Sequence, residues 1–224
     1  MTNYLLFNRS RLTRLRGILC VVAGLSSCIR MEARMDVYEY FKGDQAVSAA
    51  SAAESGHVAV LEKLLNEGLD VNTRGVDGMT LLMWAILNGN KESFEYLLLH
   101  GADPNLQLSE GTSEMAKELP FAGNSAMSFA AMHKDIWFLD TILKRGGNVN
   151  LVNPYNTRTP IYGSIAALRT LQTEELIRAG ANLNYQDNAG VTPLLFAARC
   201  NRFDLVYQML VIGADPMIKV LPVS

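Results

Sequence analysis

The sequence has few of the residues on which catalysis and metal binding depend. It holds 3 cysteines and 3 histidines in 224 residues, and the cysteines at 20, 28 and 200 form no CxxC pair. It also lacks a GxSxG nucleophile motif, a Walker phosphate loop and a GxGxxG dinucleotide motif. A metal site would need histidines from three separate segments to converge, and Cys200 is better explained as a buried or idle thiol than as a nucleophile. We therefore expect no enzyme, no catalytic residue, no metal and no cofactor.

The chain also lacks a strong charge of either sign. Its 20 basic and 22 acidic residues give a formal net charge of −2. The only charges in residues 1–27 are arginines, so the rest of the chain carries 16 basic against 22 acidic residues, a net charge of −6. Nucleic-acid binding needs clustered Lys and Arg, and nucleic acid is therefore not expected as the main partner. With 49% apolar residues, the chain predicts one folded domain plus an N-terminal extension.

No long hydrophobic run is present at the N-terminus. The apolar run at residues 18–25 follows an arginine-bearing start and precedes small residues. It is much shorter than the roughly 20 residues that span a bilayer, and the pattern predicts an export signal over residues 1–27. The alternative is an amphipathic or accidental apolar start on a cytosolic protein.

The end of this segment, Leu25-Ser26-Ser27-Cys28, resembles the lipobox of bacterial lipoproteins. The resemblance implies cleavage before Cys28, lipid on its thiol and an anchor that faces the periplasm. Several acyl chains at about 0.8 kcal/mol per buried CH₂ would make that anchor permanent. Ile29 stands where an aspartate would be expected for inner-membrane retention, which by resemblance to enterobacterial sorting favours the outer membrane.

Two methionines follow closely, Met31 and Met35. Translation from either would give a cytosolic short form of the downstream domain. The alternative is that both are ordinary linker residues.

A repeat dominates the chain after residue 44. The segments EGLDVN, HGADPN, RGGNVN, RAGANLN and IGADPM share one template. Their glycines are separated by 33, 45, 34 and 33 residues and are Gly68, Gly101, Gly146, Gly180 and Gly213. The positions 21 residues before them are Val47, Thr80, Ser125, Thr159 and Thr192. Small residues follow five positions later, at Ala52, Ala85, Ala130, Ser164 and Ala197.

These residue types suit helix–turn–helix units. Thr159-Pro160 and Thr192-Pro193 place a capping hydroxyl before a proline at the first helical position. The small residue lets two helices approach closely, and the recurring glycine accepts the left-handed backbone that ends the second helix. The apolar pairs predicted to line the second helix are Leu64-Leu65, Leu97-Leu98, Ile142-Leu143, Leu176-Ile177 and Met209-Leu210.

The repeat resembles the ankyrin repeat family, with its TPLHxA and GADxN signatures, over about residues 45–217. The resemblance implies an all-α solenoid of about five helix–turn–helix repeats joined by finger loops in a domain at 45–224. Residues 28–44 would form a linker and an N-terminal capping helix. Lys134, Leu168 and Asn201 replace the family's inter-helix glycine, and Gly163 lies inside a helix, so we expect repeats three and four to be looser.

The C-terminal end of the array departs from the family pattern. Val211 and Ile212 stand at positions that are usually polar, although end repeats need polar outer faces. Either the tail at 218–223 folds over them, or this face meets a partner.

The finger loops are the expected partner-binding surface. The finger between Asn105 and Ser125 is 12 residues longer than the one between Asn72 and Thr80, and this insertion lies within residues 106–124. Glu110, Glu114 and Glu118 recur there at steps of four beside Phe121, which suits a short helix with an acidic stripe. The other predicted contact residues are Arg74, Asp77, Tyr155, Asn156, Arg158, Gln186 and Asn188. The alternative is that these finger residues are polar only because they face water.

A lipid-tethered repeat array resembles the ankyrin-repeat lipoproteins that act as immunity proteins against phospholipase effectors of type VI secretion systems. The resemblance implies a protein partner, a phospholipase, that the chain binds and neutralises at the periplasmic membrane face, with no small-molecule substrate. Two alternatives are a periplasmic scaffold that supports a resident envelope enzyme and a secreted effector that binds eukaryotic proteins.

Overall fold

The computed structural model describes residues 36–109 and 122–219, and all of its elements lie in the unit Val37–Ser224. Over these ranges it contains eleven α-helices, one 3₁₀ helix and no strand, which confirms the all-α prediction. The elements are α1 (Val37–Tyr40), α2 (Asp44–Ser55), α3 (Val58–Asn66), η1 (Val76–Gly78), α4 (Leu81–Leu87), α5 (Lys91–Leu99), α6 (Ala126–Met132), α7 (Trp137–Lys144), α8 (Pro160–Ala166), α9 (Thr170–Arg178), α10 (Pro193–Arg199) and α11 (Phe203–Ile212).

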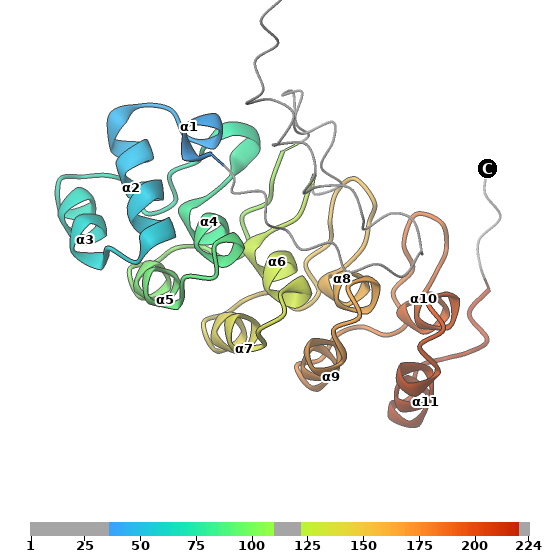
Figure 1. Cartoon of the computed structure of the whole chain (residues 1–224). Helices are drawn as coiled ribbons and strands as arrows, with labels where there is room; N and C mark the ends of the chain where they lie inside the picture. Colours follow the sequence, from blue (N-terminus) through green and yellow to red (C-terminus); the bar gives the residue numbers. More distant parts are fainter. Residues whose placement is uncertain (1–35, 110–121, 220–224) are drawn as a thin grey trace, which may run out of the picture. The chain divides into compact units, whose positions relative to one another are not determined.

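Consecutive helices pair into hairpins that stack side by side (Figure 1). The inner row holds the first helix of each hairpin, α2, α4, α6, α8 and α10, and each packs on its neighbours in that row. The outer row holds α3, α5, α7, α9 and α11. The molecule is therefore a helical solenoid of five repeats. The short helix α1 packs on α2 within the segment for which a cap was predicted.

Side-chain caps start most of the inner helices where the sequence places them. Thr80, Ser125 and Thr192 accept hydrogen bonds from the backbone N–H three residues further on. The predicted cap is absent at Thr159. Its hydroxyl makes no capping bond, and its buried oxygen has no hydrogen-bond partner. The first inner helix begins at Asp44, after Gly43, and has no side-chain cap.

The recurring glycines end the outer helices as predicted. All have a positive φ, which a residue with a Cβ adopts only at a cost. Their φ angles are 99° for Gly68, 89° for Gly101, 86° for Gly146, 89° for Gly180 and 107° for Gly213.

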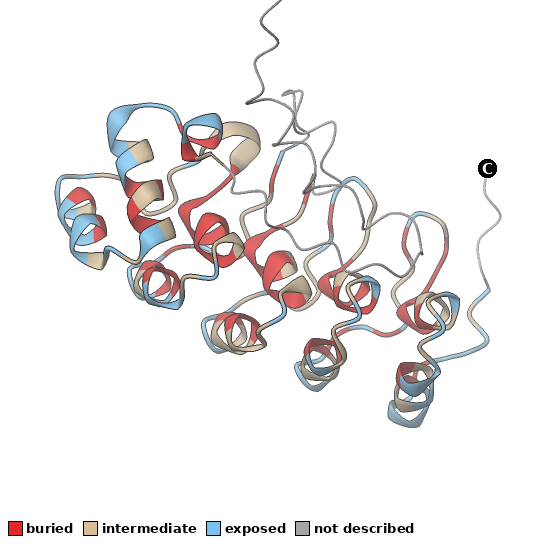
Figure 2. Cartoon of the chain, viewed as in Figure 1, coloured by how far each residue is buried: buried red, intermediate tan, exposed pale blue. Residues whose placement is uncertain are grey.

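The hydrophobic core runs between the two rows of helices, and Figure 2 shows it as buried segments on their facing sides. At the N-terminal end, Trp84 contacts the rings of Tyr40 and Phe41 at centroid distances of 5.2 and 5.7 Å. At the other end the predicted pattern fails, because Leu210 is exposed although its partner Met209 is buried. No further outer helix follows α11 in the described chain to cover it.

A ladder of asparagine side chains joins each repeat to the next. Its members, the asparagine ladder, are Asn72, Asn105, Asn150 and Asn184. Each side-chain oxygen accepts a backbone N–H of the following repeat at 2.7–2.8 Å, from Asp103, Asn148, Asn182 and Asp215 respectively. The amide groups of the first three also donate to glycine carbonyls of that repeat, at Gly101, Gly146 and Gly180. The next position in the series is Met217, which has no such amide.

The turn between the two helices of a repeat differs along the array. Gly56 and Gly89 have positive φ angles of 81° and 71°, whereas Leu168 and Asn201 are forced to 56° in the same place. The third repeat avoids this conformation, because the ring of His133 accepts the N–H of Asp135 at 3.0 Å. At these inter-helix turns, backbone strain therefore lies in repeats four and five. Gly163, expected to loosen its helix, has a packing role, because a Cβ there would approach Met132 Cγ to 3.1 Å.

Replacing Leu168 by glycine is expected to stabilise the protein. The left-handed conformation costs a non-glycine residue about 1–2 kcal/mol, and the added flexibility of glycine in the unfolded chain offsets part of that gain. The side chain is 62% exposed, so little burial is lost. We expect Leu168→Gly to raise the free energy of unfolding by about 0.5–1 kcal/mol in urea titrations. The matched control Leu171→Gly, inside α9, should lower it by about 1 kcal/mol. Equal destabilisation by both variants would contradict the assignment of strain to residue 168.

Candidate partner-binding surface

Four loops lead from an outer helix to the next inner helix and form one edge of the solenoid. We call them finger 1 (residues 73–79), finger 2 (106–124), finger 3 (151–158) and finger 4 (185–191). Each is closed at its base by a backbone hydrogen bond of 2.7–3.0 Å. These bonds are Gly75 N–H to Met79 O, Leu108 N–H to Asn124 O, Asn153 N–H to Arg158 O and Asp187 N–H to Val191 O. Each finger therefore has a fixed base.

Neighbouring fingers are hydrogen-bonded to one another. The N–H of Ser109 in finger 2 donates to the carbonyl of Asp77 in finger 1 at 2.9 Å. The Asn153 amide of finger 3 donates to Ala122 O of finger 2 at 2.7 Å. It leaves no room for a side chain at residue 123, where a Cβ would come within 2.3 Å of the Asn153 oxygen. The fingers thus form a connected row.

Two glutamines each bond to their own finger and to a segment of the following repeat. Gln107 donates to Gly123 O and to Val152 O, both at 2.9 Å. Gln186 donates to Gly190 O and to Lys219 O, both at 2.8 Å. Both glutamines lie two residues after an asparagine of the ladder. The same arrangement therefore recurs in finger 2 and finger 4.

An ion pair connects finger 3 to finger 4. Arg158 Nε lies 3.0 Å from Asp187 Oδ2, and the Asp187 side chain is fully buried. The other Asp187 oxygen accepts the N–H groups of Ala189 and Val191 at 3.0 Å. The Arg158 guanidinium lies over the ring of Phe196 at 4.7 Å. The buried carboxylate therefore has partners on both oxygens.

Beneath this pair, Tyr162 closes the base of finger 4. Its hydroxyl lies 2.7 Å from Val191 O and 2.8 Å from Tyr185 O, and burial raises the pKa of this phenol. The group therefore stays protonated and acts as a donor.

The structure divides the predicted contact residues into two groups. Arg74, Tyr155 and Asn188 are exposed on fingers 1, 3 and 4, with Tyr155 at 42%. The remaining described residues, Asp77, Asn156, Arg158 and Gln186, are partly buried. Asn156 accepts the N–H of Arg158 at 2.9 Å. The first group can meet a partner directly, and the second holds the fingers in place.

Several predicted residues lie outside the described ranges. These are the insertion residues Glu110, Glu114, Glu118 and Phe121, the predicted lipid site Cys28 and the alternative starts Met31 and Met35. Their roles stay predictions.

Sequence reasoning missed Gln107, Asn153 and Asp187, which organise the fingers. A signal was present, because Asn153 and Asp187 both stand three residues after an asparagine of the ladder. An alignment of the repeats on those asparagines, and not only on the glycines, would have shown a polar residue three positions after the asparagine in both fingers 3 and 4.

The described residues offer binding chemistry and little else. They contain no group of three His, Cys, Asp or Glu side chains that could hold a metal. Burial raises the pKa of the Cys200 thiol, and burial lowers the pKa of His133. A thiol with a raised pKa is a poor nucleophile at neutral pH. Within residues 36–109 and 122–219, no helix has both the length and the apolar character needed to cross a bilayer.

Comparison with known proteins identifies the repeat. The model for ankyrin repeats (3 copies) matches residues 31–107 and 127–220. Protein PhlB of Serratia liquefaciens is 31% identical over 189 residues, which cover 82% of this chain and 75% of PhlB. The mitochondrial disaggregase of Bos taurus is 31% identical over 169 residues, covering 72% of this chain and 23% of the disaggregase. Human palmitoyltransferase ZDHHC13 is 28% identical over 183 residues, covering 71% of this chain and 29% of that enzyme. This chain thus spans most of PhlB and less than a third of the two enzymes.

The Arg158–Asp187 pair should contribute measurably to the free energy of unfolding. Arg158→Ala removes the charged partner of a buried carboxylate, and we expect the free energy of unfolding to fall by about 1–3 kcal/mol in denaturant titrations. Arg74→Ala, at an exposed finger position, is the matched control and should change it by less than about 0.5 kcal/mol. If the two arginine variants have equal stability, Arg158 is a surface contact residue and not a structural one.

Proposed function

The chain belongs to the ankyrin-repeat family and acts through protein–protein contact, and we propose that its partner is a phospholipase effector of a type VI secretion system. On this proposal it is an immunity protein that binds the phospholipase and neutralises it at the periplasmic face of the membrane. The observation that carries the binding role is the connected row of fingers. The identity of the partner rests on the resemblance of a lipobox followed by ankyrin repeats to the immunity lipoproteins.

The finger row suits an inhibitor because it is held in place before a partner arrives. Hydrogen bonds or an ion pair link finger 1 to 2, 2 to 3 and 3 to 4. A surface that is already ordered loses less conformational entropy on binding, and preorganisation therefore raises affinity without added contacts. Tyr155 and Arg74 are exposed on this row and belong to the residue types that most often anchor interfaces.

Finger 2 is the proposed centre of the contact. It is the longest finger, and its insertion carries Glu110, Glu114, Glu118 and Phe121. The described ends of this finger, at Gln107 and Gly123, are fastened to one another and to finger 3. The described ends of finger 2 are therefore held between finger 1 and finger 3, which carry the exposed residues Arg74 and Tyr155. On this proposal the insertion covers the active site of the phospholipase or the surface that meets lipid.

The lipid anchor gives the proposal a physical basis at the membrane. A tether on Cys28 would confine the inhibitor to the surface where a phospholipase acts and raise its effective concentration there. A short form that starts at Met31 or Met35 would lack the tether and would protect the cytosol against the cell's own effector.

Charge reversal in the insertion tests the partner surface. We expect the triple variant Glu110→Lys, Glu114→Lys, Glu118→Lys to weaken binding to the neighbouring phospholipase by at least about tenfold and to abolish protection in competition with an attacking cell. The control triple variant Glu62→Lys, Glu67→Lys, Glu95→Lys changes the charge equally on exposed positions of the outer row or its end. It should leave both affinity and protection unchanged. Capture of a resident envelope enzyme in place of a phospholipase would favour the scaffold function instead.

Substitution of the predicted lipid site tests the anchor. Cys28→Ala should move the protein from the membrane fraction to the soluble fraction and abolish its labelling by radioactive palmitate. Cys200→Ala, which removes a partly buried thiol in the repeat domain, should change neither. Membrane retention and labelling of the Cys28→Ala protein would contradict a lipoprotein.

A further inference from the structure

The last outer helix carries an exposed apolar stripe. Phe203, Tyr207 and Val211 follow one another at steps of four along α11 and are 64%, 71% and 69% exposed. Leu210 and Ile212 are exposed beside them. Residues four apart lie on one face of a helix, so the three side chains form a single ridge. We call Phe203, Tyr207 and Val211 the α11 ridge.

The α11 ridge differs from every earlier outer helix at its central position. Counting back from the glycine that ends each helix, the position of Tyr207 is occupied by an acidic residue in all four preceding repeats. These residues are Glu62, Glu95, Asp140 and Glu174. The same count places Asn66, Leu99, Lys144 and Arg178 at the position of Val211. The final repeat thus has a neutral tyrosine where each of the other repeats has a carboxylate.

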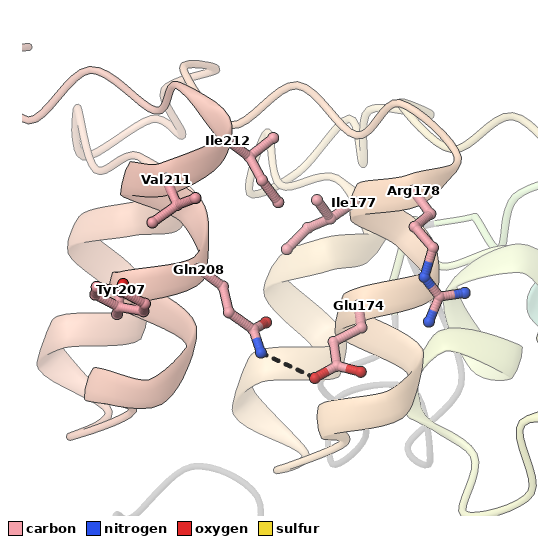
Figure 3. A pocket seen from close by; sticks show the side chains of 7 residues that line it. All are labelled: Glu174, Ile177, Arg178, Tyr207, Gln208, Val211 and Ile212. Carbon is pink, nitrogen blue, oxygen red and sulfur yellow. Dashed lines mark hydrogen bonds between the residues drawn. The ribbon is translucent and has the colours of Figure 1, made fainter.

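A groove of about 350 Å³ borders the ridge between α9 and α11. Figure 3 shows Ile212 and Ile177 pointing toward one another across this groove, with Tyr207 and Val211 on the α11 side. Gln208 donates to Glu174 at 3.0 Å across it. The Glu174 carboxylate beside this groove is therefore engaged within the fold.

The described part of the tail does not cover the ridge. Lys219 is bonded through its carbonyl to Gln186 in finger 4, at the finger edge of the molecule. Figure 2 shows the side of α11 turned away from α9 and α10 as exposed. Of the two possibilities raised by the sequence, the described residues up to 219 favour a face that meets a partner.

We propose that the α11 ridge is a homodimer interface in which α11 of one copy packs antiparallel on α11 of a second copy. The ridge is symmetric about Tyr207, because Phe203 lies four residues before it and Val211 four residues after it. A two-fold axis through Tyr207 therefore places each Phe203 opposite Val211 of the second copy. It also places the two Tyr207 side chains next to each other. A two-fold dimer is the commonest symmetry among soluble oligomers.

Charge also favours a second copy. In an interface with two-fold symmetry, a group at the axis meets its own image, and a carboxylate there would be repelled by its own copy. Any of the four earlier outer helices would bring such a pair of carboxylates together, whereas α11 brings two neutral tyrosines. The only charged residue within α11 is Asp204, which is paired with Arg202 at 2.9 Å.

The mass of the full-length chain as a function of concentration tests this interface. We would use the chain with Cys28→Ser, which removes the predicted lipid site, and analytical ultracentrifugation from about 1 to 200 µM. A single helix pair is a small interface, so we expect a reversible monomer–dimer equilibrium. Tyr207→Glu restores the acidic residue of the other repeats and should raise the dissociation constant at least about tenfold. Leu99→Glu likewise replaces an exposed apolar residue by glutamate, on α5, and should leave the dissociation constant unchanged.

Cross-linking locates the axis. In the same background, Tyr207→Cys should give a disulfide-linked dimer on non-reducing electrophoresis, whereas Leu99→Cys should give no more than the parent chain with Cys20 and Cys200. Circular dichroism would show that all variants are folded. The proposal is overturned by a monomer at every concentration, by a dimer that Tyr207→Glu leaves intact, or by equal cross-linking at both positions. A monomer whose binding to phosphatidylglycerol vesicles is lost in Tyr207→Glu would overturn it in favour of a lipid surface.

Discussion

The hydrogen bonds of the asparagine ladder set the spacing on which the rest of the molecule depends. A repeat in a solenoid contacts only its neighbours, so no distant part of the chain can correct an error in how two repeats meet. Here each ladder amide accepts an N–H from the following repeat, and three of the four also donate to a carbonyl of that repeat. Both polar ends of those three side chains are therefore used at the junction. The fingers start directly after these asparagines and inherit their regular separation.

Within each finger, residues near the base and residues further along have different roles. Residues near the base, such as Gln107, Asn153 and Asp187, use their polar groups inside the protein. Exposed residues further along the finger, such as Tyr155 and Asn188, remain available to a partner. A surface built in this way is stiff where it joins the solenoid and varied where it meets another protein. That combination suits recognition better than catalysis, in agreement with the family.

The sequence predicted the architecture well because its signals are local and repeated. Each signal indicates one local feature. The hydroxyl marks the start of a first helix, and the glycine 21 residues later marks the end of the second helix. The small residue five positions after the hydroxyl marks a close contact between helices. Arg158 shows the limit of this reasoning, because its role depends on a buried aspartate 29 positions away in the sequence. Thr159 shows another, since the capping residue type is present but the bond is absent. The 12-residue insertion within 106–124 has no counterpart in the other repeats, so periodicity gave no information about its conformation.

The replacement of the ladder asparagine by Met217 has a consequence for how such an array can change in length during evolution. A duplicated segment of about 33 residues inserted between existing repeats would bring its own asparagine and would find another before it. The asparagine hydrogen bonds to the repeats on both sides would then form without any further mutation. A repeat added after Met217 would meet a thioether that can neither accept strongly nor donate. The array can therefore gain repeats from within, whereas a repeat placed directly after Met217 would first require an asparagine codon at that position.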